Sequence, residues 1–346
     1  MILYLGLFVL LCLYGIKIYT AKDSMADYLS VWKTQSIKGI FIILVFFSHF
    51  NSYVQLTDRL DLVYKSFIDL FGQTMVTLFL FYSGYGIMES IRKKGNAYIR
   101  QLPVKRILAT IFRFDCAVLL FAAVSLAFGE RITLTRLLLS LVGWESVGNS
   151  NWYIFVILLL YFLTFVVFSL FGKYGNNVCV IAVLAFVGLY VFSFDYWGIK
   201  PVYWYNTALC YVLGMFYSLV RKKIEQIINK NLCIYLLTLI AFAGAFLALL
   251  KFSELPGAGF LVYLFFAATV VVATMRISLD NCVLRYFGKN LFELYILQRL
   301  PMMIFSKLGM EVHIEVYFAL CVISTILLAV PFKQITGKIC GKICRG

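Results

Sequence analysis

The most reactive side chain inside an apolar stretch of this sequence is a histidine. His49 ends the apolar run 39–47, and the polar residues Ser48 and Asn51 adjoin it. It is one of only two histidines in the chain. Because an imidazole ordinarily titrates near neutral pH, His49 is the natural candidate for a general base. The competing interpretation is a helix-end histidine with an ordinary hydrogen bond.

A lysine precedes this histidine at a spacing that aligns the two. Lys38 and His49 are separated by ten residues. In an α-helix this spacing puts them roughly 16 Å apart along the axis and on the same face. We therefore expect Lys38 at a membrane surface and His49 deeper, lining one tunnel. The alternative is a helix-end lysine that extends to the interface.

Other polar residues also fall within apolar stretches, where ionisable groups are unfavourable and are functional candidates. Arg113 and Asp115 are two residues apart and point in different directions on a helix, so they need separate partners. Glu293, Gln298 and Arg299 share a later stretch. Arg113 is a candidate partner for Glu293, and a structural ion pair explains both residues at least as well as catalysis.

The second histidine, His313, lies between Glu311 and Glu315. A metal ion needs more ligands than this segment offers. We therefore expect a solvated loop here and no metal site.

The composition defines the elements that must position these residues. The chain has 346 residues, of which 63% are hydrophobic and only 14% charged, and its mean hydropathy is +0.92. Soluble domains are about 45–50% apolar and about 25% charged. Such an apolar excess does not fit into one globular core, and it excludes a disordered chain. The sequence predicts an all-α, polytopic integral membrane helical bundle.

About 11 apolar segments are long enough to cross a bilayer, which takes roughly 17–25 residues. They lie near 1–20, 36–54, 63–88, 107–128, 152–172, 178–195, 203–220, 232–250, 257–275, 291–309 and 315–332. The first lacks the basic start and cleavage site of a signal peptide, so we expect it to be retained. Residues 134–143 are typical of a short amphipathic helix on the membrane surface.

Charge gives the expected orientation. The chain carries 31 Lys and Arg against 16 Asp and Glu. With the N-terminus outside, 21 basic residues fall in inside segments, 6 in outside loops and 4 within spans. This bias fits the positive-inside rule and predicts a cytoplasmic C-terminus. No nucleic-acid-binding motif accompanies the charge, so we expect no nucleic-acid partner.

Several segments, in order, resemble those of the membrane-bound acyltransferase-3 family, of the O-acetyltransferase type. The stretch from Lys38 to His49 is similar to its opening signature of a basic residue, ten residues and a histidine. Weaker similarities follow at 79–86, 98–108, 151–153 and 287–301. Lys38 stands where the family usually has Arg, and Gln298 where a second His is frequent. The resemblance places the acyltransferase-like domain at 36–332, between an extra helix and cytoplasmic loop at 1–35 and a basic cytoplasmic tail at 333–346.

The resemblance implies an acyl-CoA-dependent O-acyltransferase in a plasma membrane, as expected of a bacterial protein. It implies acetyl transfer from acetyl-CoA to a sugar hydroxyl of a cell-surface polysaccharide or a lipid-linked glycan. His49 is then the catalytic residue, and the co-substrate is acyl-CoA, with no tightly bound cofactor. Membrane lipids are further expected partners, and a homo-oligomer is left open. The candidate donor- and substrate-binding residues are Lys38, Ser83, Tyr85, Arg106, Arg113, Trp152, Glu293, Tyr295 and Gln298.

Two other functions share the same sequence features. A polytopic transporter or flippase of envelope precursors would also be basic inside and sparsely charged in its spans, although no paired Gly- or Pro-broken helices are visible in matching halves. A non-catalytic acyltransferase-like membrane scaffold would explain the departures at Lys38 and Gln298. In that case replacing His49 would leave the phenotype intact.

Overall fold

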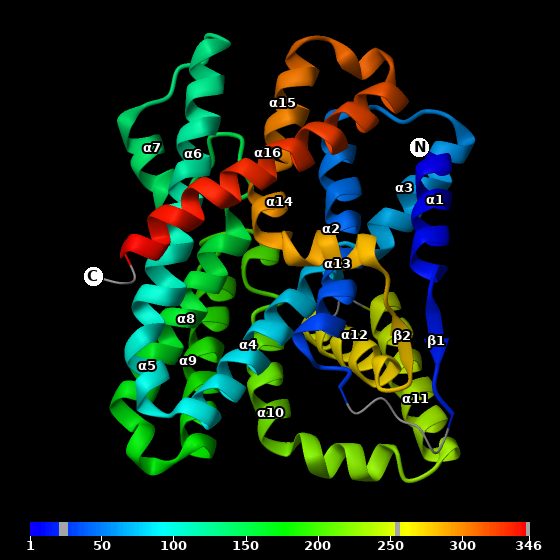
Figure 1. Cartoon of the computed structure of the whole chain (residues 1–346), viewed down its shortest axis with the longest axis vertical. Helices are drawn as coiled ribbons and strands as arrows, with labels where there is room; N and C mark the ends of the chain where they lie inside the picture. The colour runs from blue at the N-terminus through cyan, green and yellow to red at the C-terminus, as the bar shows by residue number, and fades with distance from the viewer. Residues whose placement is uncertain (21–26, 253–256, 344–346) are drawn as a thin grey trace.

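A computed structural model describes residues 1–20, 27–252 and 257–343 of the chain. The fold is 81% helical, and its helices pack into one bundle with the termini on opposite sides of the view (Figure 1). Two short strands, β1 (Ile16–Ile18) and β2 (Ile277–Leu279), pair antiparallel. The side-chain amide of Asn281 donates to the carbonyl oxygens of Leu11 and Tyr14. These contacts fasten the N-terminal helix to the rest of the bundle.

The first part of the chain forms a series of helices joined by short connections. They are α1 (Ile2–Leu13), α2 (Val31–Phe50), η1 (Asn51–Tyr53), α3 (Arg59–Phe71), α4 (Thr74–Lys94), α5 (Asn96–Leu102), the π-helical stretch η2 (Pro103–Leu108), α6 (Ala109–Ala127), α7 (Leu134–Leu141) and α8 (Trp152–Phe171).

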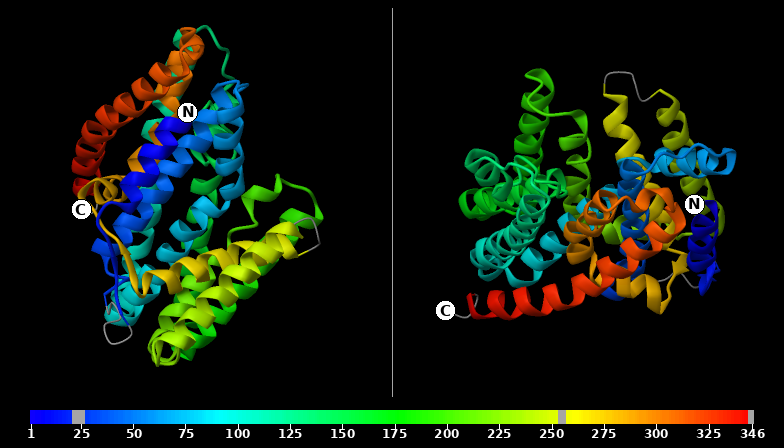
Figure 2. Two further views of the ribbon diagram at one scale, coloured as in Figure 1. Left: turned by 90° about the vertical axis from the view of Figure 1, so that its right-hand side faces the viewer. Right: turned by 90° about the horizontal axis from the view of Figure 1, so that it is seen from above.

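The second part continues with helices of more varied length. They are η3 (Gly172–Tyr174), α9 (Asn176–Tyr196), η4 (Val202–Trp204), α10 (Leu209–Ile228), α11 (Leu232–Lys251), α12 (Ala258–Thr274), α13 (Cys282–Lys289), α14 (Leu291–Leu297), α15 (Arg299–Lys307), η5 (Met310–Val312) and α16 (Ile314–Ile343). Helices α11 and α12 pack against each other as a pair that projects from the bundle (Figure 2).

Within the described residues, seven helical stretches are long and apolar enough to cross a membrane. They are Val31–Tyr53, Arg59–Lys94, Asn96–Ala127, Trp152–Tyr174, Asn176–Tyr196, Leu232–Lys251 and Ile314–Gly341. Helices α1 and α12 are apolar but shorter. The expected polytopic helical membrane architecture agrees with these stretches, while the total of eleven spans and their orientation stay predictions.

Several predicted segments differ in detail. The span expected at 291–309 is two short helices that meet at Gln298, because Pro301 has no N–H to continue the hydrogen-bond ladder. The span expected at 63–88 is interrupted where Gly72 adopts a positive φ of 38°. The tail expected from residue 333 instead continues α16. The short helix expected at 134–143 is confirmed as α7, whose Leu134 and Leu138 side chains are exposed, while its place on the membrane surface stays a prediction.

Glycines allow two pairs of helices to cross at very short distance. A Cβ atom added to Gly84 in α4 would lie 1.9 Å from the carbonyl oxygen of Tyr211 in α10. Gly214 of α10 meets α4 in the same way. Gly39 of α2 and Gly288 of α13 form the second crossing. Small residues permit such backbone approach in membrane bundles, and here they set the spacing of the helices around the site.

The start of α2 is anchored by a carboxylate on the opposite element. Asp280 forms an ion pair with Lys33 at 3.0 Å and accepts a hydrogen bond from Ser36 at 2.9 Å. Arg285 forms a second ion pair with Asp280. Burial alone would raise the pKa of Asp280, but the hydrogen bonds from Lys33, Ser36 and Arg285 outweigh it and hold that pKa below its usual value. Asp280 is therefore a charged link between α2 and α13.

Candidate active site

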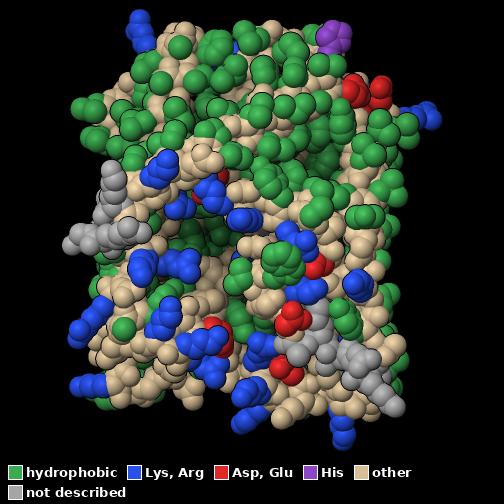
Figure 3. All heavy atoms as spheres, in the orientation of Figure 1, with side chains coloured by type: hydrophobic (Ala, Val, Ile, Leu, Met, Phe, Trp, Pro, Cys, Tyr) green, Lys and Arg blue, Asp and Glu red, His purple; other side chains and the backbone are tan. Residues whose placement is uncertain are grey.

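A large cavity of about 850 Å³ opens among α2, α4, α6, α8 and α10. Its wall is strongly basic, with the acids Asp27 and Glu89 as the carboxylates among its lining residues. Figure 3 shows a hollow in this face with Lys and Arg side chains at its rim, whereas the upper half of the view is mainly hydrophobic. A polyanion is the ligand that such a wall favours. The basic lining residues are Lys38, Lys93, Lys105, Arg106, Arg113, Arg221 and Lys289.

The cavity brings together about half of the residues expected from the sequence. Those that line it are Lys38, Ser83, Tyr85, Arg106 and Arg113. Those that do not line it are His49, Trp152, Glu293, Tyr295 and Gln298.

A π-helical stretch places two of the basic residues at the cavity. It begins at Pro103 and carries Lys105 and Arg106. Such stretches are rare and are frequent at functional sites. The Arg106 Nε donates to the hydroxyl of Tyr98 at 3.3 Å, so the guanidinium is oriented before any ligand binds.

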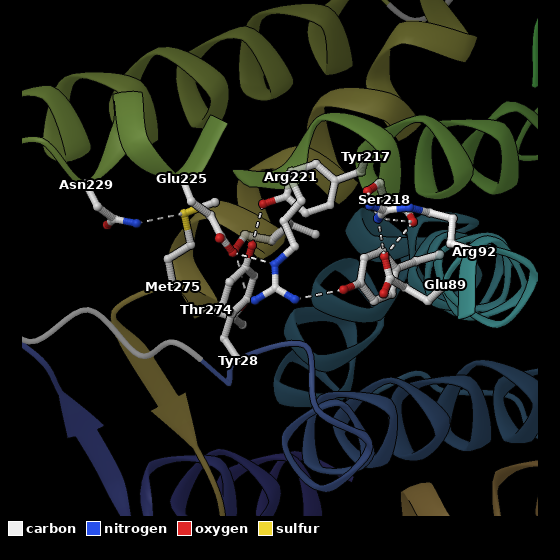
Figure 4. A network of polar contacts seen from close by, with 12 residues as sticks. Tyr28, Glu89, Arg92, Tyr217, Ser218, Arg221, Glu225, Asn229, Thr274 and Met275 are labelled. Carbon is white, nitrogen blue, oxygen red and sulfur yellow. Dashed lines mark hydrogen bonds and ion pairs between the residues drawn. The ribbon is translucent and has the colours of Figure 1, made fainter. Parts of the chain in front are cut away.

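A third arginine at the cavity was missed by the sequence reasoning. Arg221, near the end of α10, lines the cavity and donates to the hydroxyl of Tyr85 at 2.8 Å and to Glu225 at 2.5 Å. Its guanidinium lies 5.1 Å from the ring centre of Tyr28 (Figure 4). In the sequence Arg221 is only the first of three consecutive basic residues, and nothing local separates it from its neighbours.

The same region joins α4 to α10 through a shared carboxylate. Ser218 donates to Glu89 at 2.7 Å, and Arg92 forms an ion pair with Glu89 and donates to the Ser218 carbonyl oxygen at 2.6 Å (Figure 4). This network fixes the cavity wall next to Arg221.

The middle of the cavity is lined by hydroxyl groups and rings. Ser83 and Tyr161 share a hydrogen bond of 2.8 Å. The Lys38 ammonium lies 5.5 Å from the ring centre of Tyr82, within the range of a cation–π contact. These groups add hydroxyls and aromatic rings to the otherwise basic lining of the cavity.

His49 is not among the residues that line this cavity, but two tyrosines connect it to the lining. Tyr153 lines the cavity and packs edge-on against Tyr295, with ring centroids 5.3 Å apart. The Tyr295 ring in turn lies 6.0 Å from that of His49. Of the two residues expected to line one tunnel, the cavity therefore includes Lys38 alone, and a continuous path to His49 stays a prediction.

Polar atoms without partners accumulate around His49. Its Nδ1 and the Gln298 Oε1 are buried, and neither has a hydrogen-bond partner among the described residues. The Tyr295 hydroxyl is also buried, and its neighbour is the Ser150 side chain. Native proteins pair the great majority of their buried polar groups. Such a concentration of unpaired atoms is therefore typical of a place where a substrate completes the hydrogen bonds.

The ion pair suggested between Arg113 and Glu293 is confirmed. The two side chains lie 3.4 Å apart, and Lys333 approaches the other Glu293 oxygen at 3.7 Å. Glu293 is only 2% exposed, so it sits behind the cavity wall and orients Arg113, which reaches the cavity.

Trp152 and Gln298, two further candidates from the sequence, both contact tyrosines. Trp152 starts α8 and packs against the rings of Tyr153 and Tyr203. Gln298 is fully buried at the junction of α14 and α15 and donates to the Tyr295 carbonyl oxygen at 3.4 Å. Both residues therefore support the tyrosines next to His49.

The comparisons with known proteins identify the family. The family model described as "Acyltransferase domain" matches residues 35–333. Comparisons with curated proteins and with solved structures give no match. Helix α1 and strand β1 precede the matched region. Since the match covers most of the chain, this protein belongs to the acyltransferase-3 family of membrane acyltransferases.

Proposed function

We propose that the protein transfers an acetyl group from acetyl-CoA to a sugar hydroxyl of a cell-surface polysaccharide or a lipid-linked glycan, at a bacterial plasma membrane. Family membership establishes an acyltransferase in general. The observation that carries the choice of donor is the basic cavity, whose lining residue Tyr153 packs against Tyr295, the neighbour of His49.

Coenzyme A matches this cavity in the order of its chemical groups. It carries phosphates at one end, a long uncharged pantetheine arm and an acyl thioester at the other end. Arg106, Arg221 and Lys289 line the cavity and offer cations for the phosphates. The arm then follows the passage along Ser83 and Tyr161 toward Tyr153. Rotation of the Tyr153 or Tyr295 ring opens the last step to His49.

The chemistry requires one base and one proton path. His49 takes the proton from the acceptor hydroxyl, and the hydroxyl oxygen forms a bond to the thioester carbonyl carbon. The carbonyl oxygen carries the negative charge of the tetrahedral intermediate. Collapse of the intermediate breaks the carbon–sulfur bond, and the departing thiolate receives the proton from His49.

The charge distribution supports one orientation for this reaction. Basic side chains gather on the half of the molecule that holds the cavity mouth (Figure 3). We place this half at the cytoplasmic side, where acetyl-CoA is made, following the positive-inside rule. His49 then faces the outer half of the membrane, and the proposed topology has the N-terminus outside and the C-terminus inside.

The test measures O-acetylation of the cell envelope by NMR. Cells would carry the wild-type gene, a deletion, His49→Ala or His313→Ala, the last being an exposed histidine that controls for the loss of an imidazole. We expect acetyl signals in the wild type and in His313→Ala, and their loss in the deletion and in His49→Ala at equal protein level. Unchanged acetylation in the deletion would refute the proposal and favour a transport function.

A further inference from the structure

The loop before α8 holds a fixed shape under the outer end of the site. The side-chain amide of Asn151 donates to the carbonyl oxygens of Gly143 and Glu145, both at 3.0 Å. The Lys200 ammonium lies 4.4 Å from the ring centre of Trp144 and donates to its carbonyl oxygen at 2.9 Å. These contacts tie residues 143–151 together and to the segment that follows α9.

The loop is also packed against the helices on its inner side. Gly148, at a φ of 107°, leaves only 3.0 Å between an added Cβ and the Met303 sulfur in α15. Ser125 of α6 approaches the Val147 carbonyl oxygen at 3.5 Å. The last residues of the loop are therefore held beside α15, the helix that follows α14 and its Tyr295.

Ser150 places a buried hydroxyl at this position. It is only 4% exposed, and its Oγ forms no hydrogen bond of ordinary geometry with the described residues. Its side chain interacts with the hydroxyl of Tyr295, which is also buried. The two hydroxyls thus form a pair on Tyr295, whose ring lies 6.0 Å from that of His49, and each is able to donate a hydrogen bond.

The N-terminus of α8 adds backbone donors at the same place. The first amides of an α-helix have no partner within the helix, and the positive end of the helix dipole favours an anion there. The N-cap residue Asn151 does not cap these amides, because its side chain bonds to the loop carbonyls instead. Tyr153, in the first turn, packs on Tyr295, so the open end of this 20-residue helix lies beside the Ser150 and Tyr295 hydroxyls.

We propose that Ser150 and the first-turn amides of α8 form, with Tyr295, the oxyanion hole of the acyl transfer. This inference rests on the proposed function. In the tetrahedral intermediate the former carbonyl oxygen accepts hydrogen bonds from the Ser150 hydroxyl and the α8 amides. Ser150 keeps its proton throughout, while His49 carries the proton from the acceptor to the thiolate. Ser150 is then a catalytic residue that sequence reasoning did not single out.

The experiment uses the full chain in lipid nanodiscs with acetyl-CoA as donor. Envelope extract from the deletion strain supplies the acceptor, and the release of CoA thiol gives kcat and KM. We expect Ser150→Ala to lower kcat about 10²-fold, the usual effect of losing one oxyanion donor, with KM for acetyl-CoA changed less than about twofold. Ser150→Thr keeps the hydroxyl and restores most of kcat. Ser140→Ala is the matched control, because Ser140 is equally buried but already bonds to the Arg136 carbonyl oxygen.

The possible results distinguish a failure of the role proposed for Ser150 from a failure of the proposed acyltransferase function. Wild-type kcat in Ser150→Ala, together with loss of activity in His49→Ala, would overturn the role of Ser150 and leave the acyltransferase intact. A wild-type chain that releases no CoA with any envelope extract would overturn both proposals. Loss of kcat in Ser150→Ala and Ser150→Thr alike, with a lower thermal midpoint, would show a packing role and overturn the inference.

Discussion

The inner half of the site, which is the basic cavity, and the outer half, around His49, differ in how their polar side chains are paired. In the inner half several ligand-facing groups already have partners, as in the bonds of Arg221 to Tyr85, of Arg106 to Tyr98 and of Ser83 to Tyr161. The Tyr82 hydroxyl and the Arg113 Nε are exceptions there. In the outer half the His49 Nδ1 and the Gln298 Oε1 are buried without partners among the described residues. Paired groups hold their orientation in the empty protein and suit ground-state binding, whereas unpaired donors are satisfied only when charge develops in the reaction.

The two halves also differ in the helices and loops that support their residues. The inner wall rests on long helices that cross at glycines, with Gly84 of α4 against the backbone of α10. The outer end rests on the loop 143–151 and on the junction of α14 and α15 at Gln298. The first arrangement gives a rigid container, and the second permits the ring movement that the proposed reaction needs at Tyr153 and Tyr295.

The largest expected effect is a loss of stability when the crossing of α4 and α10 is disturbed. In Gly84→Ala the new Cβ would lie 1.9 Å from the Tyr211 carbonyl oxygen, so α4 and α10 must separate. We expect a loss of about 3 kcal/mol of stability, the upper end of ordinary overpacking, seen as a lower thermal midpoint of the purified protein. Gly86→Ala on the same helix meets nothing within 4 Å and serves as control. Equal midpoints for the two variants would contradict the close crossing.

The second largest expected effect is a loss of kcat when a hydroxyl is removed from the outer half of the site. Tyr295→Phe removes the buried hydroxyl beside Ser150 and keeps the ring contacts with His49 and Tyr153. We expect kcat to fall about 10²-fold, as for loss of an oxyanion donor, while KM for acetyl-CoA stays within about twofold. Tyr286→Phe, at an exposed tyrosine, controls for the chemical change. A rise in KM without a fall in kcat would place Tyr295 in donor binding instead.

The inner half predicts the reverse pattern of kinetic constants. Arg106→Gln removes a cation from the cavity wall, and we expect KM for acetyl-CoA to rise about 10-fold, the size of one charged hydrogen bond, with little change in kcat. Lys94→Gln removes an equal charge from an exposed site outside the cavity. If both variants raise KM equally, general attraction by the basic face explains donor binding better than a specific contact.

The smallest effect concerns the anchor of α2. Because the pKa of Asp280 is lowered in the folded protein, its ion pairs stabilise the fold above the ordinary aspartate pKa of about 3.9. This contribution disappears as the pH falls through the lowered value. We expect Asp280→Asn to lose about 1 kcal/mol of stability at pH 7, with the gap to the wild type closing toward pH 3 in thermal unfolding. A gap that stays constant with pH would refute the charged link, and Asp58→Asn, at an exposed aspartate, is the control.

The sequence predicted the membrane helices, the family and much of the inner half, because motif residues such as Lys38 and Arg106 lie on regular helices. The pairing of Arg113 with Glu293 was also accessible, since a buried carboxylate needs a cation. The proximity of Ser150 to Tyr295 could not be predicted from the sequence, because residues 150 and 295 meet only through tertiary packing. The same holds for the contact of Tyr153 with Tyr295, and for Arg221, whose place at the cavity depends on how α10 packs.

The most direct test of the account is a cryo-EM structure of the full chain in nanodiscs with a non-reactive thioether analogue of acetyl-CoA. The account predicts phosphate density beside Arg106 and Arg221, the pantetheine arm along Ser83 and Tyr161, and the acyl end in contact with His49 after displacement of the Tyr153 or Tyr295 ring. Phosphates bound elsewhere, or an acyl end that remains on the cavity side of an unmoved Tyr153, would contradict it.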